Sequence, residues 1–153
     1  MTDLGIDFAQ KVLDEQPFSR LLGARITAFA DGAATLEVDI RDDLRQQFGY
    51  AHGGLLAYAA DNALTFAAGT VLGPAVLTGG FSVQYLRPAR DGTLRAEAYV
   101  VHAGRRQAVC RCDIYVVGPD GASAADAADS EGRAELCAVA QGTILTAPPR
   151  ADA

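Results

Sequence analysis

Apolar and polar residues alternate along several short stretches of this chain, a pattern typical of β-strands with one buried face. The segment 34–40 alternates in this way after an Asp31-Gly32 turn, and we expect 24–30 to pair with it as a hairpin. The same period of two returns later in four more segments, which we also expect to be strands: 81–85, 94–100, 108–116 and 134–145. The pattern therefore predicts about five to six strands joined mostly by short turns.

Two other segments have helical spacing. Residues 5–15 predict a short amphipathic helix that ends before Pro17, and 18–22 is expected to form a short apolar turn. Residues 53–73 predict a long helix that is apolar on nearly every side, with Asp61 near its middle. Such a helix must be covered on every side, and a curved sheet can cover one of them. A second copy of the chain is the simplest way to bury the other side of this helix, so we expect at least a dimer.

The length of 153 residues fits one α+β domain, and we find no internal repeat or linker. We expect the core to span about 23–145, with a flexible acidic loop at 118–132 and a disordered tail at 147–153. Half of the residues are hydrophobic and 21% are charged, which is enough apolar material for a compact core.

Charge and cysteine content exclude several classes of function. Thirteen Lys and Arg against nineteen Asp and Glu give a net charge of −6, which argues against binding to nucleic acids or anionic membranes. Asp61 argues against a membrane span at 53–73, and residues 1–18 lack the apolar stretch of a signal peptide. Three cysteines and two histidines match no zinc spacing, so we expect no metal and a cytoplasmic location.

The long helix is expected to begin at His52-Gly53-Gly54, where none of the usual capping residues, Ser, Thr, Asp or Asn, is present. The first N–H groups of a helix lack partners within the helix, and the helix dipole favours negative charge there. Two glycines would let a ligand oxygen approach these N–H groups, as in an oxyanion hole. A glycine-rich turn entering a packed helix explains the same residues without any function.

Asp61 has mostly apolar neighbours, and a buried carboxylate needs a partner, a proton or a ligand cavity. Hydrogen bonds from Asp61 and Asn62 to the backbone or to a facing helix are an equal alternative to a catalytic role. Gly53 and Asp61 lie eight residues apart, about 12 Å along a helix axis. Reacting groups must approach to about 3–3.5 Å. If both take part in catalysis, Asp61 must come from an antiparallel second copy, which gives two sites per dimer.

These residues, together with Gln46, Gln84–Pro88 and Gly104–Arg106, resemble the hotdog-fold acyl-CoA thioesterases. The similarity covers about 23–145 and is greatest to the branch with the phenylacetate-pathway and hydroxybenzoyl-CoA enzymes. It implies a hotdog fold, in which a curved antiparallel sheet wraps a long central helix. It also implies hydrolysis of a small, medium-chain or aromatic acyl-CoA to the acid and CoA, without metal or cofactor. A homo-oligomer is implied as well: a dimer to form the site, and a tetramer as a dimer of dimers.

The resemblance assigns roles to five positions. The Gly53 N–H would polarise the thioester carbonyl, and His52 would support that geometry or the leaving thiolate. Asp61 of the partner subunit would act as general base or as nucleophile, and this choice remains open. Gln46 would orient substrate or water, and Thr78 would hold a water molecule.

Further residues are expected to bind the acyl group or CoA. Four arginines, at positions 87, 90, 105 and 106, lie at predicted turns where they could contact the phosphates of CoA. Any single one of them could instead serve only to keep the protein soluble. Tyr58 and Thr65 flank Asp61 at helical spacing, where they line the acyl pocket or serve ordinary packing. The pair Gly79-Gly80 is expected to widen that pocket. The full set of expected binding residues is Gly54, Tyr58, Thr65, Arg87, Arg90, Arg105 and Arg106.

Two alternative functions fit the same fold. One is a noncatalytic acyl-CoA-binding or sensing module, which would be stabilised by the ligand without turnover. The other is a hotdog hydratase or dehydratase, which uses differently spaced His and acidic residues. His102 lies beside a turn and is a poor second catalytic residue. Cys110 and Cys112 share a predicted strand face with apolar residues, so we expect buried core thiols and not nucleophiles.

Overall fold

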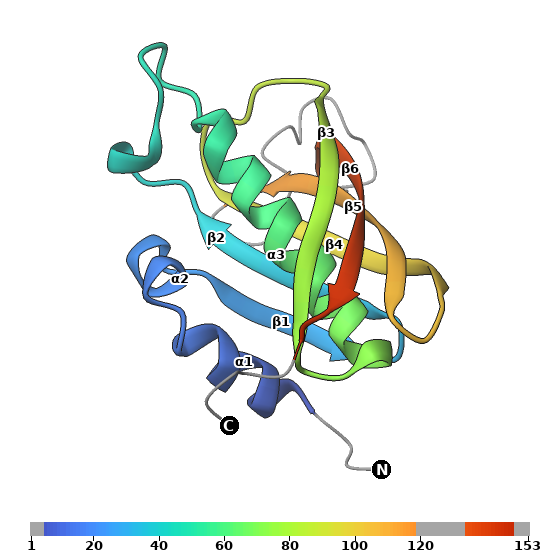
Figure 1. The fold of residues 1–153 in the computed structure, drawn as a ribbon. Coiled ribbons are helices and arrows are strands. Elements are labelled where there is room, and N and C mark those ends of the chain that lie inside the picture. The colour runs from blue at the N-terminus through green and yellow to red at the C-terminus, as the bar shows by residue number, and fades with distance from the viewer. Residues whose placement is uncertain (1–4, 119–133, 149–153) are drawn as a thin grey trace.

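The computed structural model describes residues 5–118 and 134–148 and confirms the predicted α+β architecture (Figure 1). Its strands are β1 (Arg25–Ala30), β2 (Ala33–Asp39), β3 (Val76–Tyr85), β4 (Thr93–Ala103), β5 (Gln107–Val117) and β6 (Glu135–Thr146). They form one antiparallel sheet in the order β1-β2-β4-β5-β6-β3, which curves around the long helix α3 (Gly53–Leu72). Apart from Gly118, Ala147 and Pro148, the predicted loop and tail lie outside the described residues.

Small side chains set how closely α3 approaches the sheet. Ala59, Ala60, Ala63 and Ala67 are fully buried on one side of the helix, and they pack against an inner sheet face with residues such as Leu36. Alanine favours the helix and lets its axis lie close to the strands. Among the described residues, α3 is the single helix that is long and apolar enough to cross a membrane. Its buried alanine side shows that it packs as a core helix.

The other side of α3 carries the few polar side chains of a helix that is otherwise apolar, as predicted. Tyr58, Asp61, Asn62 and Thr65 follow one another at intervals of three, one and three residues, so they form one half-buried polar stripe. Hydrogen bonds join this stripe to Ser19 and to β3. The stripe therefore places polar chemistry midway along the central helix.

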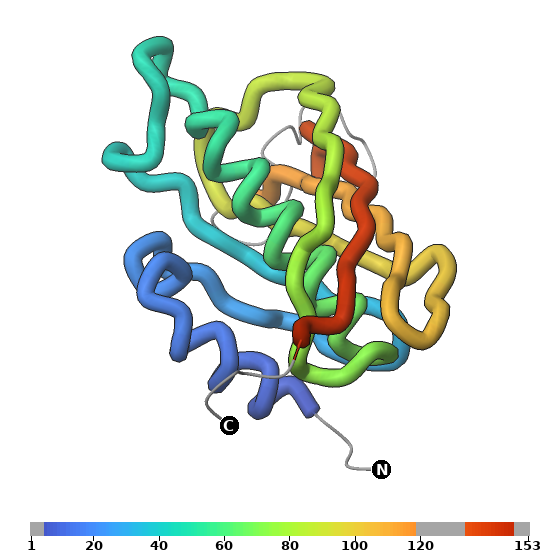
Figure 2. Tube along the Cα trace, viewed as in Figure 1, coloured from blue at the N-terminus to red at the C-terminus, as the bar shows by residue number. Residues whose placement is uncertain are grey.

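Two helices precede the sheet (Figure 2). Helix α1 (Ile6–Asp14) lies within the range 5–15 predicted to be helical. Helix α2 (Pro17–Leu22) replaces the predicted apolar turn, so that prediction is wrong. Proline is well suited to the first position of a helix, and Gly23 ends α2 in the left-handed region at φ 73°. These two residues are start and stop signals that the hydrophobic pattern alone does not reveal.

Strand β3 begins at Val76, five residues before the predicted start, and contains a bulge. Thr78 pairs with Ile144 and Gly80 pairs with Thr143, so Gly79 is the extra residue. An extra residue reverses the alternation of faces. Thr78 is therefore half-buried on the same side as Phe81, although the two are three residues apart. The bulge therefore directs the Thr78 side chain toward α3.

We expect Leu64→Ala to lower the free energy of unfolding by about 2–5 kcal/mol, because Leu64 is fully buried in the contact between α3 and the sheet. Urea titration followed by circular dichroism measures this loss. Val101→Ala, at an exposed position of β4, serves as the control and should change stability by less than about 1 kcal/mol. Equal losses in both variants would contradict the assignment of Leu64 to the core.

Candidate active site

A histidine caps the start of α3. His52 has extended backbone angles, and its Nδ1 accepts a hydrogen bond from the Gly54 N–H at 2.8 Å. An imidazole that accepts at Nδ1 carries its proton on Nε2. A Cβ on residue 54 would lie 2.9 Å from Nδ1, so this cap requires glycine. Histidine therefore takes the place of the usual capping residues, and the Gly54 N–H, which was expected to be open to a ligand, is already paired.

Gly53 retains an open N–H at this helix start. No acceptor contacts this N–H in the part of the chain that the structure describes. The Tyr85 hydroxyl donates to the Gly53 carbonyl at 2.7 Å, and a Cβ on residue 53 would lie 3.3 Å from that hydroxyl. Tyr85 therefore orients the first peptide of α3 and leaves little room for a side chain there. One open amide remains, where two were expected.

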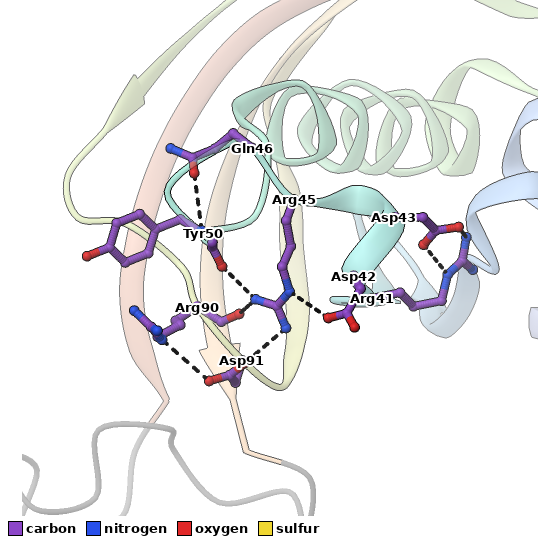
Figure 3. A network of polar contacts seen from close by, with 9 residues as sticks. Arg41, Asp42, Asp43, Arg45, Gln46, Tyr50, Arg90 and Asp91 are labelled. Carbon is purple, nitrogen blue, oxygen red and sulfur yellow. Dashed lines mark hydrogen bonds and ion pairs between the residues drawn. The ribbon is translucent and has the colours of Figure 1, made fainter.

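An open cleft adjoins Gly53 and is bordered by Gln46. The Gln46 Oε1 accepts a hydrogen bond from the N–H group of Tyr50 at 3.2 Å (Figure 3). It also accepts one from the N–H group of Phe48 at 2.6 Å. Among the described residues its Nε2 has no partner, so one amide donor stays available at the cleft. The residues that line the cleft with Gly53 come from the loop before α3, from α3 itself and from the end of β3 onward: Gln46, Tyr50, Ala51, Leu56, Tyr85, Leu86, Arg87, Pro88 and Ala89.

Arg45 links the two loops that border this cleft, one before α3 and one between β3 and β4 (Figure 3). Its guanidinium lies 3.1 Å from the Asp42 carboxylate and 2.9 Å from the Asp91 carboxylate. It also donates to the Gly49 carbonyl at 2.7 Å and to the Arg90 carbonyl. The hydrogen bond with Asp91 raises the pKa of Arg45, which therefore stays charged. Sequence reasoning did not single out Arg45, because its partner Asp91 is 46 residues away.

Asp61 lies two helical turns beyond Gly53 and is held by Thr78. The Thr78 hydroxyl donates to Asp61 Oδ1 at 2.6 Å. Thr65 donates to the Asp61 carbonyl at 2.8 Å, and its hydroxyl lies 3.1 Å from that of Thr78. Oδ2 of Asp61 has no partner among the described residues. A carboxylate held by one oxygen and free at the other is oriented to accept a proton or to attack.

Tyr58 and Asn62, on either side of Asp61, belong to a polar network beneath α2. The Tyr58 hydroxyl donates to Ser19 at 2.7 Å, and Asn62 donates to Tyr58 at 3.1 Å and to Gln16 at 3.0 Å. Ser19 is 1% exposed and donates to Gln16 at 2.6 Å. Burial raises the pKa of Tyr58, so the phenol stays protonated. Tyr58 and Thr65 also line an open pocket together with Asp61 and Thr78.

Two of the expected phosphate-binding arginines lie near the Gly53 cleft. Arg87 lines it and forms an ion pair with Glu135 at 2.5 Å. Arg90 lies over the Tyr50 ring, 5.6 Å from its centre, and 3.9 Å from Asp91. Both side chains are more than half exposed, so they remain accessible to an anionic ligand.

The other two expected arginines, Arg105 and Arg106, lie in the turn between β4 and β5. Strand β4 has eleven residues and separates this turn from Arg90, which is about 35 Å at the usual rise of a strand. The structure therefore does not bring the four arginines together within one copy of the chain. Only Arg87 and Arg90 lie at the start of α3.

The three cysteines lie in the core, as predicted for Cys110 and Cys112. All three are fully buried, and burial raises the pKa of Cys110 and Cys137 to about 11 and that of Cys112 still further. They stay protonated and are poor nucleophiles. Among the described residues no group of three or more His, Cys, Asp or Glu side chains could hold a metal ion.

Comparison with solved structures defines the class of fold. The chain is similar to a thioesterase family protein from Silicibacter pomeroyi, with 29% identity, a TM-score of 0.77, and coverage of 92% of this chain and 98% of the other. It is also similar to a variant of the phenylacetic acid degradation protein PaaI from Thermus thermophilus, at 30% identity and TM-score 0.69, covering 86% of this chain and 99% of that one. Together with PaaI from E. coli (22% identity, TM-score 0.74, 92% and 91% coverage), these structures define the hotdog fold.

Sequence comparison gives the family. The profile described as Thioesterase superfamily matches residues 48–122, which include Gly53, Asp61 and Thr78. The 1,4-dihydroxy-2-naphthoyl-CoA hydrolase of Listeria monocytogenes serotype 1/2a (strain 10403S) is 26% identical over 86 residues, which are 55% of this chain and 70% of that protein. The chain belongs to the thioesterase superfamily and is a thioester hydrolase.

Tyr85 is a site residue that sequence reasoning missed, although it lies within the Gln84–Pro88 segment. We expect Tyr85→Phe to lower kcat/KM for a thioester about 2- to 10-fold, because it removes the hydrogen bond to the Gly53 carbonyl, which helps to hold the residue that carries the open N–H. Steady-state kinetics with a short acyl-CoA measures this change. Tyr99→Phe, on the partly exposed face of β4, is the matched control and should leave kcat/KM as in the wild type. Equal kinetics in both variants would exclude Tyr85 as a positioning residue.

Proposed function

We propose that the chain hydrolyses small, medium-chain or aromatic acyl-CoA thioesters to the free acid and CoA, in a site shared between two subunits. One observation supports this most strongly. A single helix carries an open N–H at Gly53 and, two turns later, a carboxylate at Asp61 that is oriented by Thr78. Thioester hydrolysis needs both kinds of group, a donor for the carbonyl oxygen and a base or nucleophile for the carbonyl carbon.

The chemistry follows from these two groups. The Gly53 N–H donates to the thioester oxygen as negative charge develops on it, and the helix dipole favours that charge. Asp61 Oδ2 removes a proton from a water molecule that attacks the carbonyl carbon, or attacks the carbon itself to form an anhydride that water then opens. The carbon–sulfur bond breaks, and the proton ends on the thiolate of CoA. Gln46 lines the Gly53 cleft and His52 precedes Gly53, and the Nε2–H groups of both are proposed as donors to the leaving sulfur or the substrate.

A dimer is required because the two groups are about 12 Å apart on one helix. Strand β3 is an edge of the sheet, and Leu77, between the half-buried Val76 and Thr78, is 58% exposed. Exposed edges of this kind pair with a second chain unless they are blocked. Antiparallel pairing of two β3 strands about a twofold axis supports an antiparallel arrangement of the two α3 helices. Asp61 of each copy then faces Gly53 of the other.

CoA binding is proposed to use the side of the site with exposed cations. Arg87 and Arg90 are exposed beside the Gly53 cleft, where guanidinium groups suit the phosphates of CoA. Arg105 and Arg106 would contribute only from another copy of the chain. A tetramer formed as a dimer of dimers, and a cytoplasmic location, remain predictions.

The direct test is release of free thiol by the wild-type protein from a panel of acetyl-CoA, hexanoyl-CoA and benzoyl-CoA. A chromogenic thiol reagent reports released CoA cleanly, because the protein's own three thiols are buried. We expect multiple turnovers with at least one member of the panel. Saturable stabilisation by acyl-CoA without any thiol release would overturn the proposal in favour of a binding module.

A further inference from the structure

We infer that Arg45 is a positioning residue: without binding the substrate itself, it fixes the CoA-binding arginine Arg90 in place relative to the Gly53 N–H. The inference rests on the proposed function, because it concerns the same site. Arg45 lies in the loop before α3, whereas Arg90 lies in the loop between β3 and β4. The contacts that join these two loops therefore determine how far the group that binds phosphate lies from the group that binds the thioester carbonyl.

Arg45 is held by four acceptors, and its side chain is only 19% exposed. Its Nε donates to Asp42 at 3.1 Å, and its Nη2 donates to Asp91 at 2.9 Å. Its Nη1 donates to the carbonyl of Gly49 at 2.7 Å and to the carbonyl of Arg90 (Figure 3). A guanidinium has five N–H groups in one plane. Four of these donors are engaged by the protein, so Arg45 acts on the loops and not on the substrate.

One end of this link is a small hairpin that leads into α3. Arg45 and Ala51 form an antiparallel bridge, and the Gln46 N–H donates to the Tyr50 carbonyl at 2.9 Å. The side chain of Arg45 closes the hairpin by binding the Gly49 carbonyl. The hairpin ends where α3 begins, so its position relative to the first N–H groups of that helix is fixed.

The other end of the link is the loop between β3 and β4. The Ala51 N–H donates to the Ala89 carbonyl at 2.7 Å, and Arg45 binds the carbonyl of the next residue, Arg90. The Arg90 guanidinium lies over the Tyr50 ring of the hairpin, 5.6 Å from the centre of the ring. Both the backbone and the side chain of Arg90 are therefore attached to the hairpin, and through it to the start of α3.

Such a link pre-organises the site for a long ligand. A CoA thioester extends from the carbonyl at Gly53 to the phosphates at Arg90, so it gains affinity when the distance between these two groups is set in advance. A thioester of N-acetylcysteamine carries the same acyl group and the last part of the pantetheine arm, but it has no phosphate to place at Arg90. Arg45 should therefore matter much more for the CoA thioester than for the truncated one.

Arg45→Lys breaks the link but keeps the charge, because an ammonium on a flexible chain cannot join the four acceptors that the planar guanidinium joins. Arg111→Lys is the matched control: Arg111 is exposed on β5, and its Nε donates to Gln141 at 2.9 Å. Arg90→Ala is a second test variant. It removes an exposed guanidinium but keeps the carbonyl that Arg45 binds, so it should fold.

The experiment takes whichever of acetyl-CoA, hexanoyl-CoA and benzoyl-CoA is hydrolysed fastest and compares its kcat/KM with that of the N-acetylcysteamine thioester of the same acid. Arg45→Lys should lower the ratio of the two values about 5- to 20-fold, mainly through a higher KM for the CoA thioester, and Arg111→Lys should retain the wild-type ratio. A general loss of structure would lower both values alike.

Arg90→Ala should lower the same ratio by a similar factor. Adding Arg45→Lys to Arg90→Ala should lower it little further, because Arg45 is inferred to act through Arg90 and the two losses are then not additive. An unchanged ratio in Arg45→Lys or in Arg90→Ala, or fully additive losses in the double variant, would overturn the inference.

A binding measurement separates this inference from the proposed function. Isothermal titration calorimetry with free CoA should give a Kd that is about 5- to 20-fold higher for Arg45→Lys than for the wild type, and unchanged for Arg111→Lys. Such a dependence without hydrolysis of any thioester would refute the proposed function and leave the role of Arg45 standing. Thiol release by a protein whose Kd for CoA does not depend on Arg45 would refute the role of Arg45 alone.

Discussion

Asp61→Asn should lower kcat for acyl-CoA hydrolysis by about 10²–10⁴-fold, because an amide can neither accept the proton of water nor attack the carbonyl carbon. The amide can still accept the hydrogen bond from Thr78, which lies 2.6 Å from Asp61 Oδ1, so the fold should be kept. Thiol release measures kcat, and circular dichroism verifies folding. Asp31→Asn, in the exposed β1–β2 turn, is a matched control, because Asn-Gly and Asp-Gly favour the same turn.

Full activity in a folded Asp61→Asn variant would remove Asp61 from the mechanism. If activity is lost, a single turnover in oxygen-18 water distinguishes the two roles of Asp61. Direct attack places the first oxygen-18 in the carboxylate of the protein, whereas general-base catalysis places it in the acid product. The two results can be read by mass spectrometry of the protein and of the product.

Two inactive variants should restore activity when they are mixed. Gly53→Val blocks the helix start, because even its Cβ would lie 3.3 Å from the Tyr85 hydroxyl, while Asp61→Asn removes the carboxylate. In a mixed dimer, Gly53 of the Asp61→Asn subunit faces the intact Asp61 of the other subunit. Random exchange makes half of the dimers mixed, each with one working site of two, so about a quarter of wild-type activity should return.

The measurement is thiol release after unfolding and refolding the two variants together, compared with the same variants refolded separately. No recovery in mixtures whose subunits are shown to exchange, for example by mass spectrometry, would mean that Gly53 and Asp61 do not act across the interface. The shared site would then be wrong even if each residue were essential.

Local signals in the sequence were sufficient for much of the fold. The Asp31-Gly32 turn and the alternation around it predicted the β1–β2 hairpin, and the long apolar run predicted α3. Helix α2 was missed because a six-residue helix has too little periodicity to detect. The start of β3 was missed because Gly79-Gly80 interrupts the alternation, and the bulge at Gly79 appears only once β3 is paired with β6.

The candidate site was predictable where its residues share one helix. Gly53, Asp61 and Thr65 have fixed spacing on α3, so their separation followed from the sequence. The cap formed by His52 was missed because histidine is not among the common capping residues. Contacts between distant segments, such as Tyr85 with Gly53 or Arg45 with Asp91, depend on how the sheet brings loops together. The separation of the four arginines has the same origin, since the length of β4 sets it.

The burial of Cys110, Cys112 and Cys137 has a consequence for an enzyme whose proposed product is itself a thiol. Oxidised coenzyme A forms mixed disulfides with protein thiolates that it can reach, and the formation of such adducts requires an accessible, ionised sulfur. Here the sulfurs are enclosed in the sheet interior and hold their protons at neutral pH. If CoA–SH is the product, as proposed, its oxidised form should therefore not trap the protein covalently.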